Sequence, residues 1–445
     1  AKEGINDDKL DLFAMIEYSH FADNKEKTAQ FLSKPENLLD CARDYMKAGF
    51  YDDALYALDL FAGSSPLINY YKAYLKGDKS FIKKAEKEEM GYCFPSNIED
   101  IQVLKYAIEE DNTAANARYY LGCLFYDRFR FDEAAKCFEE CVLINPSHAR
   151  AWRNLSLYYF DKLKMGEKAL YCMENALKFC PTDPRLLLEY EQLLKNTGAD
   201  IEKRLAVYDK YPELLKQRDD CYLDRLTLLS MQGKYEEAVK LAANKHFHIY
   251  EGGEGKLTKL HAWMYVLLGN EYSKSGDKTK AEEAYKKGIN MPKSYGEAKT
   301  FFNQEAHIYY YLSKLYSGEE RVKALEKAAE YKAAVSEISL FRALALKELG
   351  KDDEAKAVLD EMLEVADNHI INKDMRTYYG VGSPSPMPFE FDIEKNNLIS
   401  GYTLKAFALL GLEKYSEAEI CIRKAESLDK NNFEVYAFRQ VALND

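Results

Sequence analysis

The amino-acid sequence predicts an all-α protein, a solenoid built from about ten antiparallel helix pairs. Three observations lead to this prediction. A pattern of small and large apolar residues recurs about every 34 positions, and about seven of the units are clear. Glycine and proline, which interrupt helices, are scarce among the 445 residues, with 22 and 11 copies. The composition, 47% hydrophobic and 31% charged, is that of a folded protein and not of a disordered one.

One repeat unit is clearest between residues 115 and 146. Small residues, Gly122 and Ala134, are expected where the two helices of a pair cross closely, and the large residue Phe138 fills the space between them. Pro146 ends the second helix because proline cannot continue it. A pair with this pattern cannot bury its apolar faces alone, so we expect the pairs to stack in an array.

The next unit opens with Trp152 and Leu155, a Trp-x-x-Leu phrase. This opening and the spacing of the small residues resemble the tetratricopeptide repeat. The resemblance implies a right-handed α-solenoid, or superhelix, in which the first helix of each pair lines a concave groove. It also implies a binding surface and not a catalytic centre.

Breaks in the pattern divide the chain into six segments. A helical cap precedes the repeats, two inserted loops interrupt them, and a capping helix follows the last repeat. The predicted boundaries are 1–34 for the N-terminal cap, 35–243 for the first repeats, 244–257 for a loop rich in His, Gly and Glu, 258–366 for further repeats, 367–397 for a loop rich in Pro and aromatic residues, and 398–445 for the last repeat and its capping helix.

Capping residues predict two helix starts inside this scheme. Residues 91–99 form a loop before a helix, with Ser96 or Asn97 as the cap of that helix. The final helix is expected to be capped by Asn431 or Asn432.

Charge and composition exclude several classes of function. The formal net charge of −12 repels phosphate backbones and anionic membranes, so we expect no nucleic-acid partner and no membrane partner. No run of 18 apolar residues and no apolar signal core is present. The nine cysteines are scattered without a Cys-x-x-Cys motif, which indicates reduced core thiols in a cytoplasmic protein.

Seven residues of the predicted groove combine Tyr, Arg and Asn, types that are frequent at binding hot spots. The alternative is that the aromatic members pack between neighbouring repeats. A clamp for chaperone C-termini is disfavoured, because Tyr119 and Cys123 stand where that clamp needs a basic residue and an asparagine. The candidate groove residues are Asn116, Tyr119, Tyr126, Asp127, Arg150, Arg153 and Asn154.

The 244–257 loop is the second candidate site, since it gathers imidazoles, carboxylates and a lysine around glycines. The alternative is a turn between helices, with Glu254 favoured by the dipole of the next helix. The loop is not a phosphate-binding loop, and a metal would need further ligands from elsewhere. The candidate loop residues are His246, His248, Tyr250, Glu251, Glu254 and Lys256.

Four phrases, at residues 94–96, 119–127, 246–256 and 389–397, carry a closer resemblance. Together they resemble the C-terminal helical region of a large bacterial tetratricopeptide family. Longer members of that family carry β-rich, carbohydrate-related-looking domains upstream. The resemblance implies that this chain is the repeat half of a larger protein, and it supplies no catalytic residue.

We therefore expect a non-catalytic scaffold or binding module with no cofactor and no metal. It would engage a protein, or a domain of its own parent chain, through the groove and the inserted loops. The alternative is glycan binding by the groove and by Glu251 and Glu254, as an accessory region of a glycan-processing enzyme. Homodimerisation through a terminal repeat is left open.

Overall fold

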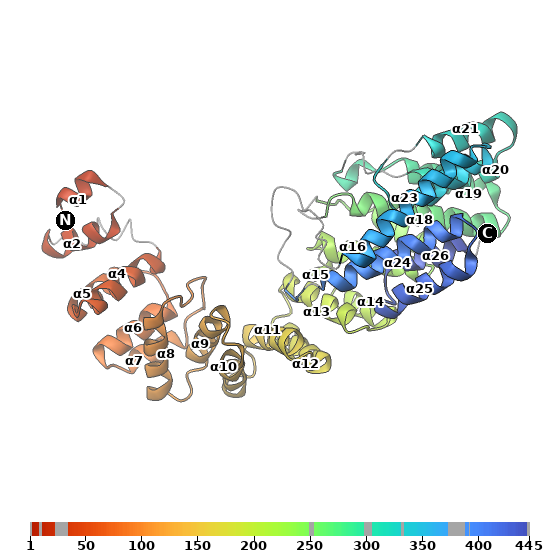
Figure 1. Cartoon of the computed structure of the whole chain (residues 1–445). Coiled ribbons are helices and arrows are strands. Elements are labelled where there is room, and N and C mark those ends of the chain that lie inside the picture. The colour runs from red at the N-terminus through yellow and green to blue at the C-terminus, as the bar shows by residue number, and fades with distance from the viewer. Residues whose placement is uncertain are drawn as a thin grey trace. The chain divides into compact units, whose positions relative to one another are not determined.

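The computed structural model describes residues 2–8, 11–22, 34–248, 253–297, 305–330, 333–372, 388–390 and 392–442. Within these residues every regular element is a helix and there is no strand, so the predicted all-α fold is confirmed. The helices group into two compact units, Ala1–Pro181 and Thr182–Asp445, and each is described by itself (Figure 1). None of the described helices is long and apolar enough to cross a membrane.

Unit 1 is a series of antiparallel helices that pack against their neighbours in sequence. Its elements are α1 (Lys2–Asp7), α2 (Leu12–Ala22), α4 (Pro35–Lys47), α5 (Tyr51–Asp59), α6 (Pro66–Lys76), α7 (Ser80–Ala85), α8 (Ile98–Glu110), α9 (Ala115–Asp127), α10 (Phe131–Ile144), α11 (Ala149–Leu157), the π-helical turn η1 (Tyr158–Lys162) and α12 (Gly166–Phe179).

Unit 2 continues the same kind of packing. Its elements are α13 (Pro184–Asn196), α14 (Ile201–Lys210), α15 (Pro212–Leu215), α16 (Asp219–Met231), α17 (Tyr235–Ala243), α18 (Lys256–Lys274), α19 (Lys278–Ile289), the 3₁₀ turn η2 (Lys293–Tyr295), α20 (Ala306–Leu315), α21 (Gly318–Ala329), α22 (Ser339–Glu348), α23 (Asp352–Ile371), α24 (Ile393–Gly411), α25 (Tyr415–Leu428) and α26 (Phe433–Ala442).

Small residues lie where paired helices cross, as the repeat pattern predicts. A Cβ atom on Gly122 of α9 would lie 2.6 Å from the ring of Phe138 on α10. A Cβ atom on Gly269 of α18 would lie 2.2 Å from the ring of Tyr285 on α19. Real Cβ atoms do not approach so closely, so a glycine is required for the aromatic ring to fill the crossing.

Tyrosine hydroxyls join successive helix pairs. Tyr158 donates to Asp132 Oδ1 at 2.7 Å, and Tyr316 donates to Glu282 Oε1 at 2.9 Å. In each case the ring contributes apolar area to the junction while its hydroxyl reaches a carboxylate on the helix before it. This arrangement accounts for part of the high tyrosine content of 35 residues.

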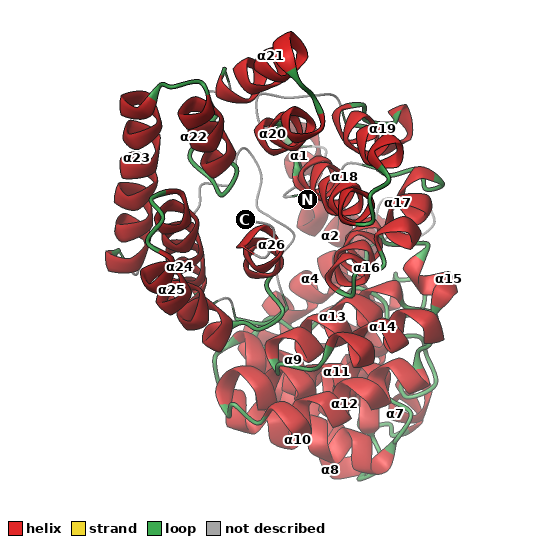
Figure 2. Ribbon diagram, turned by 90° about the vertical axis from the view of Figure 1, so that its right-hand side faces the viewer, coloured by secondary structure: helices red, strands yellow, loops and turns green. Residues whose placement is uncertain are grey.

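Unit 2 closes on itself. Helices α16, α18, α20, α22, α24 and α26 contact one another in this order, and α26 contacts α16 again. Figure 2 shows α26 on the inner side of the arc that the other helices form. The hydroxyls of Tyr235 and Tyr436 share a hydrogen bond of 2.5 Å across this closure. One hydrophobic core joins the helices from α17 to α26 and includes residues from Tyr235 to Val441.

Candidate functional site

Two of the predicted groove residues are buried inside unit 1. Asn116 is 9% exposed and Tyr119 is 4% exposed. Asn116 Nδ2 donates to the main-chain carbonyl of Glu86 at 3.3 Å, and the Tyr119 ring lies 4.6 Å from the ring of His148. Tyr119 thus packs against the residue that precedes the next helix pair, which is the alternative that the sequence left open for the aromatic residues.

The other five predicted residues lie at the ends and edges of α9 and α11. Tyr126 is half-buried and Asp127 is exposed at the end of α9. On α11, Arg150 is exposed, whereas Arg153 and Asn154 are half-buried. Arg153 Nη1 donates to Asn154 Oδ1 at 3.2 Å. The structure thus brings the two arginines and the asparagine together on one helix.

The 86–97 segment, which follows α7, lies across the first helices of three successive pairs. The segment makes its contacts through side chains and main-chain carbonyls. It lies over the face where a groove was predicted. Its contacts are Asn69 Nδ2 of α6 to Glu88 Oε2 at 2.7 Å, the ring of Tyr120 of α9 to the ring of Phe94 at 5.8 Å, and Arg150 Nη1 of α11 to the Met90 carbonyl at 2.8 Å.

Glu86 anchors the start of this segment. Its carboxylate accepts the main-chain N–H groups of Asn116 at 2.9 Å and Ala117 at 3.1 Å, and the hydroxyl of Tyr70 at 2.5 Å. Helix α9 has no capping side chain of its own, so Glu86, which directly follows α7, satisfies its first free N–H groups. Burial raises the pKa of Glu86 above its ordinary value, and the three donors partly oppose that rise.

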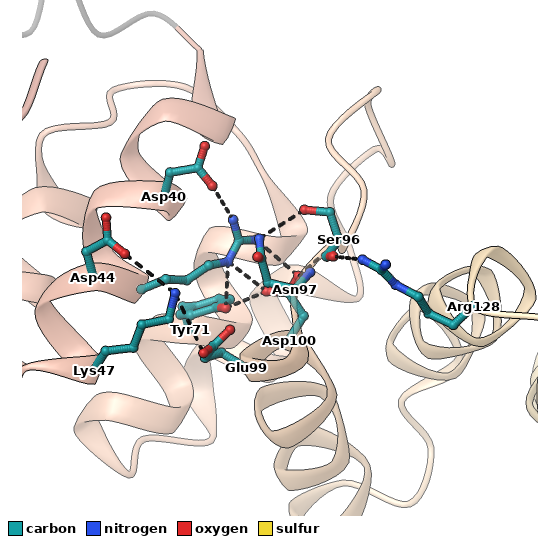
Figure 3. Close-up of polar contacts among 10 residues, drawn as sticks. Asp40, Asp44, Lys47, Tyr71, Ser96, Asn97, Glu99, Asp100 and Arg128 are labelled. Atoms are coloured by element: carbon teal, nitrogen blue, oxygen red, sulfur yellow. Dashed lines mark hydrogen bonds and ion pairs between the residues drawn. The ribbon is translucent and has the colours of Figure 1, made fainter. Parts of the chain in front are cut away.

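Asp100 anchors the other end of the segment (Figure 3). This fully buried carboxylate accepts the N–H groups of Ser96 at 2.7 Å and Asn97 at 2.9 Å, so the predicted start of α8 at this cap is confirmed. Asp100 also accepts hydrogen bonds from Arg43 Nη2 of α4, 2.9 Å away, and from the hydroxyl of Tyr71 of α6. Burial lowers the pKa of Arg43, but Tyr71 and Asp100 together raise it above its ordinary value.

Large apolar side chains are exposed beside this anchored segment. Tyr92 is 97% exposed, Ile98 is 82% exposed and Phe129 is 80% exposed. Arg128 Nη2 donates to the Ser96 carbonyl at 2.5 Å, which ties the turn between α9 and α10 to the segment (Figure 3). We call the resulting surface the apolar rim. It consists of Tyr92, Phe94, Ile98 and Phe129.

Phe129 occupies a backbone position that favours glycine. In seven helix pairs, the residue two positions before the second helix is left-handed, which closes the turn. Phe129 has a φ of 59°, and two polar residues, Lys164 and Glu413, have φ values of 54° and 61°. A side chain in this region is strained. Glycine fills the same position at residues 49, 233, 276 and 350.

Exposed apolar side chains are unevenly divided between the units. Of the large hydrophobic residues exposed in the described part of the chain, fourteen belong to unit 1 and four to unit 2. Scattered exposed apolar residues are normal, but a concentration of them indicates an interaction surface. The four of unit 2 are Val322, Ile371, Tyr415 and Ile420.

The two histidines of the 244–257 loop lie together. The rings of His246 and His248 are 5.3 Å apart. The main-chain N–H of His248 donates to Asp219 Oδ2 at 2.6 Å. Among the described residues, no group of three or more His, Cys, Asp or Glu side chains could hold a metal ion. All nine cysteines are free thiols, and six of them are buried.

The carboxylates of this loop are only partly described. Glu254 is exposed and Lys256, also exposed, is the first residue of α18. Gly255, with a φ of 75°, stands just before the helix and permits the sharp turn. Tyr250 and Glu251 lie outside the described residues.

Unit 2 contains a second buried arginine. Arg204 of α14, 1% exposed, pairs with Glu191 of α13 and with Asp224 of α16, whose Oδ2 is 3.0 Å from Nη2. Two carboxylates therefore share one guanidinium. Burial, and next the charge of Asp224, raise the pKa of Glu191 to about 8.

Comparison with known proteins identifies the repeat class. The family model described as "Tetratricopeptide repeat" matches residues 115–148, and a second model with the same description matches residues 264–295 and 399–432. The chain therefore contains tetratricopeptide repeats in both units, and this part of the sequence-based prediction is confirmed.

Solved structures of low sequence identity are also similar. A MamA fragment from Desulfovibrio magneticus RS-1 is 17% identical over 42% of this chain and 97% of its own, with a TM-score of 0.26. The pilF protein of Pseudomonas aeruginosa is 19% identical over 46% of this chain and 88% of its own, with a TM-score of 0.28. A Naa15/Naa10 structure with HypK-THB is 14% identical over 90% of this chain and 64% of its own, with a TM-score of 0.31.

Proposed function

We propose that this protein is a non-catalytic binding module that docks a protein surface through the apolar rim of unit 1. The docked surface belongs to another chain or to a neighbouring domain of a longer parent chain. The observation that carries the proposal is Phe129, which is 80% exposed in a left-handed turn that other pairs close with glycine.

Folding gains little from this phenylalanine, whose ring meets the ring of Phe131 edge-on at 6.0 Å. The left-handed conformation costs about 1 kcal/mol relative to glycine, and the exposed ring buries little area to offset that cost. Lys164 and Glu413 bear the same backbone strain with side chains that water solvates. A residue that breaks a local rule without a stabilising gain points to a function.

The anchors of the 86–97 segment support a rim that is ready to bind. Asp100 and Glu86 fix the two ends, and Arg128 holds the neighbouring turn at 2.5 Å from Ser96. A surface held in one conformation loses little entropy when a partner docks. Because the segment covers the predicted groove face, the rim and not the groove is the surface that we assign to the partner.

Site-specific photo-crosslinking in cells tests this proposal. A photoreactive phenylalanine replaces Ile98 in one variant and Phe129 in another. The matched control carries it at Leu143 of α10, which is 82% exposed in the same unit but outside the rim. We expect one protein species to crosslink from both rim positions and not from the control position.

Crosslinking of that species should also disappear when Tyr92 is replaced by Ser in the Phe129 variant. Equal crosslinking from Leu143, or none from either rim position in folded protein, would contradict the proposal. The carbohydrate alternative depends on the groove and on Glu251 and Glu254. Glu251 lies outside the described residues, and no observation in the described part of the chain favours this alternative.

A further inference from the structure

Helix α26 is held inside unit 2 by apolar side chains and by a few polar links. Val435, Phe438 and Val441 are each 3% exposed or less, and the ring of Phe438 meets the ring of Phe407 of α24 at 5.2 Å. Asn432 Oδ1 accepts the N–H of Val435 at 3.0 Å, so the predicted cap of this helix is confirmed. Spacings of three residues put the apolar side chains on one face of the helix.

The charged link of α26 to the start of the arc is built around Lys259 of α18. Its ammonium lies 2.9 Å from Glu434 of α26 and also 2.9 Å from Glu337, which precedes α22. About a third of each side chain of Lys259 and Glu434 stays accessible, at 35% and 37%. If α26 leaves, Lys259 keeps one carboxylate partner, and Glu434 goes to water.

The link at the other end of α26 behaves in the same way. Arg439 pairs with Glu419 and with Glu426 of α25, 2.7 Å away, and all three side chains are about one-third exposed. Release of the helix therefore strands no buried charge. The Arg43–Asp100 pair of unit 1 is different, because its separation would leave the fully buried Asp100 carboxylate without a charged partner, although Arg43 would keep Asp40, 2.7 Å away.

We propose that the inner face of unit 2 is a binding site for an amphipathic helix of a partner protein, with α26 as the occupant when the partner is absent. The partner helix would present apolar side chains at positions i, i+3 and i+6, as Val435, Phe438 and Val441 do. A carboxylate one position before the first of them would take the place of Glu434 on Lys259. This inference rests on the proposed role as a protein-binding module but uses a different unit.

Peptide binding to the full chain tests the site directly. The probe is a fluorescent peptide with the sequence of residues 429–442, and its anisotropy is followed. In the Phe438→Asp/Val441→Asp chain, α26 is detached, and we expect the peptide to bind about 100-fold more tightly than to the parent chain, whose own helix competes. The matched control is Tyr415→Asp/Ile420→Asp, an equal charge change at two exposed positions of α25, which should behave as the parent.

Peptide variants identify the chemistry that is recognised. A peptide with Phe438→Asp should lose binding, and a peptide with Glu434→Gln should bind about 5- to 10-fold more weakly, since Lys259 retains Glu337. The Phe129→Gly chain should bind the parent peptide as the parent chain does. Failure of the rim and failure of this inner face are thereby distinguishable.

Hydrogen exchange of the parent chain provides a readout that needs no detached variant. Amides of α26 should exchange faster than those of α16 and α24, because the helix leaves without global unfolding. Excess peptide should increase their exchange further. Equal protection of α26, α16 and α24 would overturn the proposal, as would a folded detached chain that ignores the peptide. A chain dimer that dissociates when peptide is added would assign the site to a second copy and would also overturn it.

Discussion

The two units cover their inner faces in different ways. Unit 1 uses the 86–97 segment, which is inserted between α7 and α8 and is fixed at both ends by carboxylates, the half-buried Glu86 and the fully buried Asp100. Unit 2 uses its last helix, α26, which is held by apolar contacts and by half-exposed ion pairs. Separating the charged groups that hold the 86–97 segment would cost much free energy. Water can replace the polar contacts that hold α26.

This difference shows that a groove in a repeat protein need not be the open surface. In unit 1 the fixed cover leaves its own outer edge, the apolar rim, as the exposed feature. In unit 2 the covering helix α26 is the occupant that we propose a partner helix replaces. The predictions below test how far the two covers differ, from the largest expected effect to the smallest.

The buried pair of unit 1 should give the largest effect. Asp100→Ala removes the buried carboxylate partner of Arg43, which keeps the exposed Asp40, and frees the N–H groups of Ser96 and Asn97. We expect a loss of about 3–5 kcal/mol in the free energy of unfolding, measured by urea denaturation. Glu133→Ala, which removes an exposed partner of Arg130, is the control and should change little. Equal small losses for both variants would argue against a fixed cover.

The apolar anchor of α26 should give the next effect. Phe438→Ala removes a ring that is 2% exposed and contacts Phe407, so we expect a loss of about 3 kcal/mol in unit 2. Hydrogen exchange should show the loss first in α26 and in the part of α16 that it contacts. Ile420→Ala, at a 58% exposed position, serves as the control. A loss below about 1 kcal/mol would mean that α26 contributes little to the closure.

The stability of unit 2 should depend on pH through Glu191. Its pKa is raised from 4.5 to about 8, so between these values the folded chain binds a proton that the unfolded chain does not. The free energy of unfolding therefore falls as pH rises through this window, by roughly 1–3 kcal/mol. Glu191→Gln should flatten this dependence in urea titrations at pH 5, 7 and 9. An unchanged slope in the variant would exclude Glu191 as its source.

Phe129→Gly should give the smallest change in stability and the opposite sign. The left-handed turn suits glycine, so we expect a gain of about 0.5 kcal/mol, seen as a small rise in the thermal midpoint. Partner crosslinking from Ile98 should weaken in the same variant. Lys164→Gly is the control, because it relieves the same strain outside the rim. A stabilised variant that keeps full crosslinking would remove Phe129 from the proposed docking surface.

The repeat architecture could be predicted because its cause is local and periodic. The spacing of Gly122 and Phe138 alone predicts a close helix crossing, and the structure places the two residues in contact. The caps at Asn97 and Asn432 were likewise predictable, since a cap acts within three residues.

The covers of both inner faces could not be predicted in this way. Nothing periodic links Asp100 to Arg43, which are 57 residues apart, or Glu434 to Lys259, which are 175 residues apart. Tyr119 was assigned to the groove from its repeat position, yet it is buried because the fold packs it against His148. A lone lysine or arginine within an apolar helix pattern is a weak signal of such a buried pair.

The closure of unit 2 also has a consequence for synthesis. The hydrogen bond between the hydroxyls of Tyr235 and Tyr436 cannot form until Tyr436, 201 residues later in the chain, has been synthesised. At about 5–20 residues per second, the ribosome needs roughly 10–40 s to make that stretch. During this interval the inner face of α16 and α18 lacks α26, so the partner helix that we propose would meet no competitor there.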